Sequence, residues 1–104
     1  MLCDVDQKSF TLSLDDAVRK ITPRTAAVAP VHLFGNACYV GGINQLARRH
    51  KLKVIWDAAQ AHGTRYRGRD IGSFDDVVTY SFYPTKNITS AEGGMIVNQR
   101  STTV

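Results

Sequence analysis

Two segments of the chain carry apolar residues at helical spacing. The first follows Ser13, a good helix N-cap, with Asp16 in the position that completes a capping box. The second follows Gly41-Gly42 and is closed by basic residues 48–51, which suit the negative end of a helix dipole. The apolar residues at helical spacing are Leu14, Ala17, Val18 and Ile21 in the first segment, and Ile43, Leu46 and Ala47 in the second.

Short apolar runs of strand length lie between and after these helices. They are residues 26–29, 53–57, 77–82 and 94–98. Pro30 cannot donate a ladder hydrogen bond and therefore marks the end of the first strand. Residues 60–76 are rich in Gly, Arg and Asp and predict a loop, and residues 100–104 predict an unstructured tail. The alternation of strand and helix predicts an α/β domain with a largely parallel sheet.

Length and composition fit one small domain over residues 1–104, with 43% hydrophobic residues and a net charge of +4. Basic residues gather at 48–51 and 65–69. They suit either an anionic partner or a solvated helix end and polar loop. A nucleic-acid site would show aromatic residues interleaved with the basic ones, and Tyr66 is the only such residue here. This favours a solvated helix end and a polar loop.

The two cysteines, Cys3 and Cys38, lie far apart, with no CxxC and no Cys/His cluster. This predicts a reduced, cytoplasmic setting without a disulfide scaffold or a metal site. No apolar run approaches the ~20 residues that span a bilayer, so no membrane partner is expected.

Polar side chains follow two of the predicted strands. Asp57 ends one strand with Gln60 three residues on, and Ser81 lies near the end of the next strand with Lys86 shortly after it. Ligands of open α/β sheets bind beyond the carboxyl ends of the strands. Pyridoxal 5′-phosphate (PLP) needs a lysine for covalent attachment, an acid for its ring nitrogen, and donors for its phosphate and phenolic oxygen.

Each of these residues also has an ordinary interpretation. Lys86 alone fits a surface lysine, and Asp57 fits an N-cap or an ion-pair partner. Gln60 and Ser81 fit ordinary polar positions, and His62 fits a hydrogen-bonded structural histidine. The joint arrangement is what favours a cofactor site.

Several longer motifs carry a family resemblance. The chain has DAAQAHG at residues 57–63, GSF at 72–74, SFYPTKN at 81–87 and EGG at 92–94, with ITPRT at 21–25 and PVHLFG at 30–35. These motifs resemble segments of the DegT/DnrJ/EryC1/StrS family of PLP-dependent sugar aminotransferases, over roughly residues 3–98. The resemblance implies part of a fold type I large domain, a three-layer sandwich, without its N-terminal part and its small C-terminal domain.

The resemblance also implies roles for these residues. Lys86 would attach the cofactor and move a proton during the reaction, and Asp57 would pair with the ring nitrogen. Gln60 would lie beside the phenolic oxygen, and Ser81 would hold the phosphate. Members of the family transfer an amino group from glutamate or glutamine to a keto-sugar that is usually nucleotide-linked, in dimers with shared sites.

The resemblance further implies that a strand outside this sequence separates residues 26–29 from residues 53–57. Losing that strand would leave an unpaired sheet edge or force the strands to rearrange, which predicts self-association or an exchange of elements between chains. Three hypotheses therefore stand beside each other: an aminotransferase fragment with half a PLP site, a non-catalytic remnant that acts through self-association or protein binding, and a small basic module that binds nucleic acid.

Overall fold

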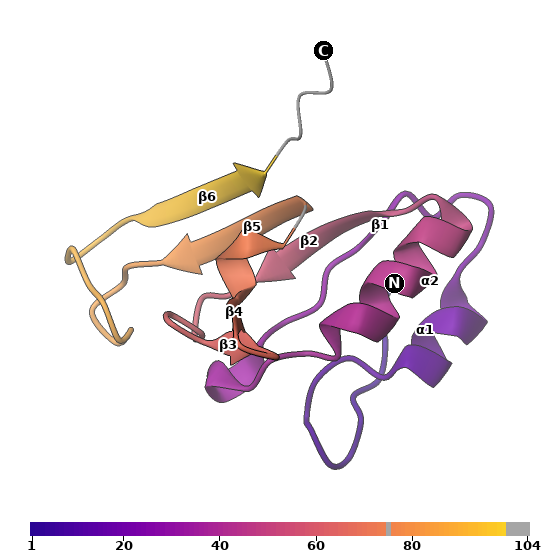
Figure 1. Cartoon of the computed structure of the whole chain (residues 1–104), viewed down its shortest axis with the longest axis horizontal. Helices are drawn as coiled ribbons and strands as arrows, with labels where there is room; N and C mark the ends of the chain where they lie inside the picture. The colour runs from indigo at the N-terminus through magenta and orange to yellow at the C-terminus, as the bar shows by residue number, and fades with distance from the viewer. Residues whose placement is uncertain (75, 100–104) are drawn as a thin grey trace.

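Four strands form one sheet in the computed structural model, which describes residues 1–74 and 76–99. The order is β1 (Ala27–Val28), β2 (Lys53–Asp57), β5 (Asp76–Ser81) and β6 (Gly94–Gln99). β1, β2 and β5 run parallel, and β6 is antiparallel to β5 (Figure 1). The predicted α/β class with a mostly parallel sheet is confirmed. The predicted tail, residues 100–104, lies outside the described residues.

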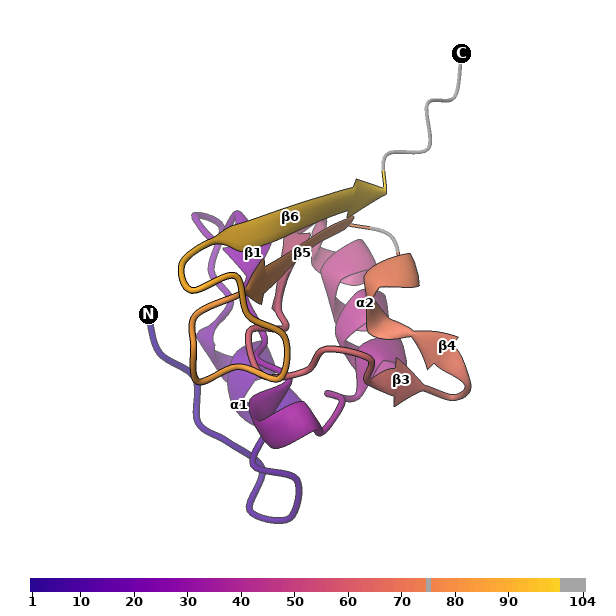
Figure 2. The ribbon, with the colours of Figure 1, turned by 90° about the vertical axis from the view of Figure 1, so that its left-hand side faces the viewer.

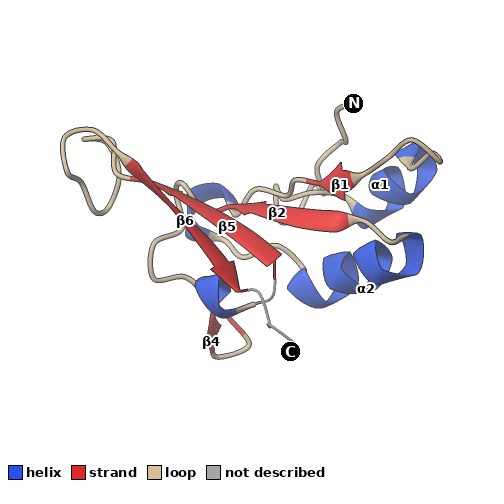
Figure 3. Cartoon of the chain, turned by 90° about the horizontal axis from the view of Figure 1, so that it is seen from above, coloured by secondary structure: helices blue, strands red, loops and turns tan. Residues whose placement is uncertain are grey.

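Both helices pack on one face of the sheet. α1 (Leu14–Lys20) and α2 (Val40–His50) lie below the strands in Figures 1 and 2. The described residues place no helix on the opposite face, and Figure 3 views the strands from that side. The described chain therefore supplies the sheet and one helical layer of the three-layer sandwich. None of its helices is long and apolar enough to cross a membrane.

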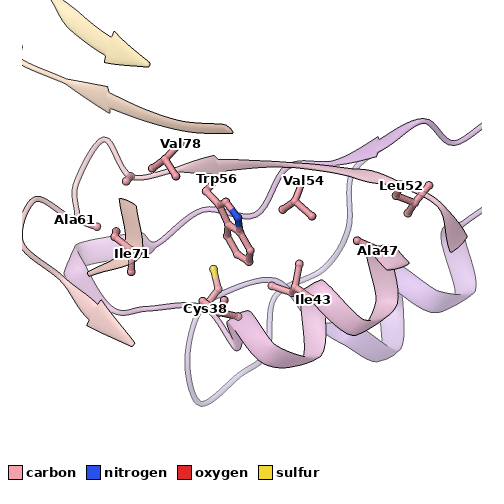
Figure 4. Close-up of a cluster of buried hydrophobic side chains, with 11 residues drawn as sticks. Cys38, Ile43, Ala47, Leu52, Val54, Trp56, Ala61, Ile71 and Val78 are labelled. Atoms are coloured by element: carbon pink, nitrogen blue, oxygen red, sulfur yellow. The ribbon is translucent and has the colours of Figure 1, made fainter. Parts of the chain in front are cut away.

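The core lies between β2 and α2. Val54 and Trp56 point from β2 toward the helices and are each 1% exposed, because alternate residues of a strand share a face. Trp56 extends toward Cys38 and Ile43, at and near the start of α2 (Figure 4). Val78 of β5 closes the same cluster at 0% exposure. This packing accounts for the clean alternation of buried and exposed residues along β2.

The beginning of α1 agrees with the sequence pattern only in part. Ser13 Oγ accepts a hydrogen bond from Asp16 N at 3.3 Å, so the predicted N-cap is confirmed. The reciprocal bond of a capping box is not formed: Ser13 N donates to Asp4 O, and Asp16 Oδ2 accepts from Asp4 N instead. Val18 was predicted on the buried face and is 52% exposed, because no described element covers that side of the helix.

α2 begins at Val40, one residue before the two glycines, and the predicted basic residues close it. Gly42 is needed for close packing, since a Cβ there would lie 2.5 Å from Leu14 Cδ1. Lys51 follows the helix in the left-handed conformation with φ 55°. The helix therefore starts earlier than its apolar pattern and ends where its charges predict.

Two expectations were wrong. Residues 60–76 are not all loop, since they contain the hairpin β3 (Arg65–Tyr66) and β4 (Arg69–Asp70) and a 3-10 turn, Ile71–Ser73. Polar strands this short leave no apolar alternation to detect. The first strand is also not separated from the next, because β1 pairs directly with β2, with Lys53 N donating to Ala26 O at 3.0 Å.

Candidate active site

The carboxyl ends of β2 and β5 meet at one edge of the sheet, on the left in Figure 1. Asp57 of β2 stands opposite Thr79 of β5 in the parallel register. Ser81 lies two residues beyond Thr79, so the pleat puts it on the same face as Thr79. Asp57 and Ser81 therefore lie on the face that no described helix covers, at the ends of adjacent strands.

Asp57 is half-buried and held from three sides. Its Oδ1 accepts from Ala59 N at 2.9 Å, its backbone O accepts from His32 N at 2.9 Å, and its N donates to Pro30 O. Neither ion pair of the described residues includes Asp57, so its interpretation as an ion-pair partner is not supported. Its second carboxylate oxygen makes no hydrogen bond within the described chain and can accept one from a ligand.

His32 lies behind Asp57 in the core, and the sequence pattern gave no sign of its role. Its ring stacks on Trp56 with centroids 5.2 Å apart and is 1% exposed. Nδ1 accepts from Cys38 N at 3.0 Å, so the ring proton sits on Nε2. Burial lowers the pKa of His32 to about 4, although the negative charge of Asp57 acts to raise it. His32 is therefore a neutral support for the strand end that carries Asp57.

Gln60 is exposed and lies beyond the end of β2. Its Oε1 accepts from Phe34 N at 3.2 Å. Phe34 belongs to the 3-10 turn Leu33–Gly35, which follows β1. The amide oxygen is thus occupied, and the amide NH₂ remains available as a donor.

Ser81 and Lys86 belong to the segment that joins β5 to β6. Ser81 Oγ accepts from Tyr83 N at 3.4 Å, which leaves its O–H free to donate. Lys86 is half-buried, and its backbone N donates to Tyr83 O at 2.9 Å, which closes a turn. The segment is tied at its base by Phe82 N donating to Gly93 O at 2.9 Å. Lys86 is therefore carried on a loop whose two ends are fixed.

The EGG turn shows why glycine is required at the start of β6. Gly93 has φ 140°, a conformation that L side chains rarely adopt. A Cβ on Gly94 would lie 2.9 Å from Tyr80 O. Both glycines thus allow the chain to return directly beside the strand that carries Ser81.

Asp57 and Ser81 come together at this edge, whereas His62 lies against the other face of β5. No hydrogen bond or ion pair within residues 1–74 and 76–99 links any two of Asp57, Gln60, Ser81 and Lys86. His62 packs against Tyr80 and Phe82, which alternate with Ser81 along the chain, and neither of its ring nitrogens has a hydrogen-bond partner in that part of the chain. His62 is thus a packed ring on the helical side and lacks the hydrogen bonds expected of a structural histidine.

The polar groups at this edge have the chemical character that the functional groups of PLP require. The free oxygen of Asp57 suits a protonated ring nitrogen, the Gln60 NH₂ a phenolic oxygen, and the Ser81 hydroxyl a phosphate. The Lys86 amine suits the aldehyde. The described residues contain no group of three or more His, Cys, Asp or Glu side chains that could hold a metal ion.

Comparison with known proteins identifies the family to which this chain belongs. The model of the DegT/DnrJ/EryC1/StrS aminotransferase family matches residues 1–103. The chain belongs to this family, whose members are PLP-dependent aminotransferases.

Individual members of the family are similar to this chain in sequence. The chain is 49% identical over 96 residues to GDP-perosamine synthase of Caulobacter vibrioides, covering 92% of this chain and 26% of that protein. It is 50% identical over 80 residues to the dTDP-3-amino-3,4,6-trideoxy-alpha-D-glucose transaminase of Streptomyces venezuelae, covering 76% of this chain and 21% of that protein. The chain thus spans about a quarter of the length of the curated relatives it matches.

Solved structures agree with this fold. The structure of DesI in the presence of its TDP-sugar product matches with a TM-score of 0.91 and 36% identity, over 96% of this chain and 26% of that one. NtdA of Bacillus subtilis, solved with bound PMP, matches with a TM-score of 0.87 and 36% identity, over 96% and 22%. The described strands and helices therefore have the arrangement found in sugar aminotransferases.

Proposed function

We propose that this chain forms part of the cofactor site of a PLP-dependent sugar aminotransferase, with Asp57, Gln60, Ser81 and Lys86 as its contribution. The observation that carries the proposal is the register of β2 and β5, which sets Asp57 opposite Thr79. Ser81 is the last residue of β5, so both side chains lie at the same edge of the sheet. A carboxylate on a rigid strand end is well placed to hold a ring nitrogen. Bound PLP supplies an electron sink for removing the proton from the substrate Cα.

The four residues have distinct roles in this proposal. Lys86 would attach the cofactor and, once released, would move the proton between the substrate Cα and C4′ of the cofactor. Asp57 keeps the ring nitrogen protonated through a charge-assisted hydrogen bond. Ser81 donates to the phosphate, and Gln60 donates to the phenolic oxygen.

The substrate class comes from the relatives. Several relatives are named for GDP-, UDP- and dTDP-linked sugars, and one is an L-glutamine:2-deoxy-scyllo-inosose aminotransferase. We therefore propose a nucleotide-linked keto-sugar as acceptor and glutamate or glutamine as donor for the parent activity, in the cytoplasm. The chain by itself is not expected to turn over substrate, because it offers few walls to position one.

Borohydride trapping tests the cofactor site. The Lys86 amine condenses with the PLP aldehyde and releases water, and hydride from borohydride then makes the C–N link permanent. Peptide mapping of the reduced protein is expected to find the adduct on Lys86 above the level on Lys51 and Lys53, which are exposed lysines of the same chain. Equal labelling of all three lysines contradicts the proposal.

A second candidate is self-association, and β6 is the observation that favours it. β6 pairs only with β5 in the described sheet, and its other edge is open. It holds no charged residue and no proline, and Ile96 is 71% exposed. Natural proteins place charges or prolines on such edges to prevent association. We therefore propose that the chain forms homo-oligomers through this edge.

Sedimentation velocity over a range of concentrations tests this second candidate. The chain is expected to show a concentration-dependent mass, and Ile96→Lys is expected to shift it toward the monomer. Val18→Lys is the matched control, because Val18 is 52% exposed on α1, away from the sheet edge. A monomer at every concentration contradicts self-association and leaves the cofactor proposal untouched.

A further inference from the structure

The turn after β1 has an unusual backbone for its sequence. Phe34 has φ 56° and ψ 27°, and Gly35 follows with φ 78°, so two successive residues are left-handed. Glycine adopts this conformation freely, whereas a phenylalanine is strained in it. The Phe34 side chain is 79% exposed, so burial of the ring does not offset the strain. Contacts made by the backbone must hold the turn in this shape.

Three of the hydrogen bonds at this turn run to Asp57, the last residue of β2, and to the segment that follows it. His32 N donates to Asp57 O at 2.9 Å, Phe34 N donates to Gln60 Oε1 at 3.2 Å, and Thr64 Oγ1 donates to Gly35 O at 2.9 Å. The chain after β1 is thus fastened at three points to the end of β2 and the segment that follows it. The central bond uses the N–H of the strained residue, Phe34.

This bond determines which end of the Gln60 amide is free. An N–H can only donate, so the Gln60 atom that faces Phe34 must be the oxygen. The NH₂ end then points away from the turn, and no described group accepts from it. A phenolate oxygen needs a donor and would be repelled by the amide oxygen.

The geometry points to the turn Leu33–Gly35 as the positioning element for Gln60: the Phe34 N–H takes the amide oxygen, so that the NH₂ is presented to the cofactor ring. The inference rests on the proposed function for the identity of the ligand. The fastening of Gln60 by Phe34 can be measured without any ligand. Phe34 acts through Gln60 and is a positioning residue.

Three substitutions distinguish the contributions of the Gln60 oxygen, the Gln60 NH₂ and the Phe34 side chain. Gln60→Glu keeps an acceptor for Phe34 N–H but replaces the NH₂ donor with an acceptor. Gln60→Met removes both ends at similar length. Phe34→Gly keeps the N–H and removes the ring and the strain. Gln45→Met is the matched control, because Gln45 is an exposed glutamine on α2.

Hydrogen exchange of the residue-34 amide, measured by NMR on the chain without PLP, tests the fastening. Protection is expected in the original protein and in Gln60→Glu, Phe34→Gly and Gln45→Met. In Gln60→Met the amide is expected to exchange roughly tenfold faster, as the loss of one hydrogen bond predicts. An unchanged rate in Gln60→Met overturns the inference.

An absorbance titration of bound PLP tests the orientation. A donor to the phenolic oxygen stabilises the anionic form of that oxygen. Without the donor, the proton beside the oxygen is held more tightly and its pKa rises. The pH midpoint is expected to rise by about one unit in Gln60→Met and further in Gln60→Glu, and to stay unchanged in Phe34→Gly. Equal midpoints in the original protein and in Gln60→Glu overturn the inference. If PLP binds nowhere on the chain, the proposed function fails, while the exchange rates still decide whether Phe34 holds Gln60.

Discussion

The two faces of β2 differ in nearly every property. Val54 and Trp56 face the helices and are each 1% exposed, whereas Ile55 on the other face is 41% exposed and Asp57 is half-buried. Residues on the first face are apolar and packed, and their loss should unfold the chain. On the second face the Asp57 side chain makes one hydrogen bond within the described chain, from Ala59 N. One strand thus separates the residues that hold the fold from those proposed to carry chemistry, so either set can be changed alone.

Truncating the packed face should have the largest effect. Trp56→Ala removes the largest side chain of the core, and a loss of about 3–5 kcal/mol of unfolding free energy is expected. That is a large share of the ~5–15 kcal/mol that stabilises a domain of this kind. Urea denaturation measures the loss. Ile55→Ala is the control on the other face and should cost less than half as much; equal losses would remove the distinction between the faces.

Acidification should destabilise the packed face next, through His32. Its pKa is lowered from 6.5 to about 4 by burial, so the unfolded chain binds a proton at higher pH than the folded chain. Stability is therefore complete above pH 6.5 and falls as the pH drops from 6.5 toward 4, by on the order of 3 kcal/mol.

Urea midpoints at pH 7 and pH 4.5 check this effect. His32→Gln cannot titrate and should remove part of the pH dependence, while His50→Gln, at the exposed end of α2, should not. An identical pH dependence in the original protein and in His32→Gln would contradict the assignment to His32.

Gly42→Ala should have a smaller effect on the same face. Alanine favours a helix by about 1 kcal/mol, but its Cβ would approach Leu14 Cδ1 to 2.5 Å and Tyr39 Cδ1 to 2.6 Å. Overpacking costs about 1–3 kcal/mol, so after the helical gain a net loss of up to about 2 kcal/mol is expected in thermal or urea unfolding. Gly41→Ala, whose Cβ would meet Tyr66 Oη at 3.3 Å, should cost less. A more stable Gly42→Ala protein would mean that α2 can move.

Asp57→Asn should change stability least, by within about 0.5 kcal/mol, because asparagine keeps the oxygen that accepts from Ala59 N. It removes the charge proposed to face the ring nitrogen, so the Kd for PLP should rise by roughly tenfold or more. Denaturation and fluorescence titration measure the two quantities. A large loss of stability with unchanged PLP affinity would make Asp57 a structural residue.

The packed face was also the part that the sequence predicted best. β2 begins and ends where its apolar pattern predicts, because burial of alternate residues leaves a direct trace in residue type. The hairpin β3–β4 left no such trace, since its strands have two residues each and are polar. Val18 follows the helical spacing but is exposed, because spacing gives the face of a helix without saying what covers it.

The placement of Asp57 and Ser81 at one edge of the sheet was predictable from the sequence, whereas the residues that support that edge were not. Asp57 and Ser81 follow from the rule that strand ends carry ligands, and the register of β2 and β5 agrees with it. Phe34 and His32 could not be found in this way. The role of Phe34 depends on a left-handed backbone, and that of His32 on a hydrogen bond to Cys38, six residues on, and stacking on Trp56 from another strand.

A crystal structure of the borohydride-reduced complex with PLP tests the central claim most directly. The pyridine nitrogen is expected at roughly 2.6–3.2 Å from the Asp57 carboxylate, with the cofactor joined to Lys86 Nζ. A ring joined to Lys86 but turned away from Asp57, or attached to another lysine, would contradict the account.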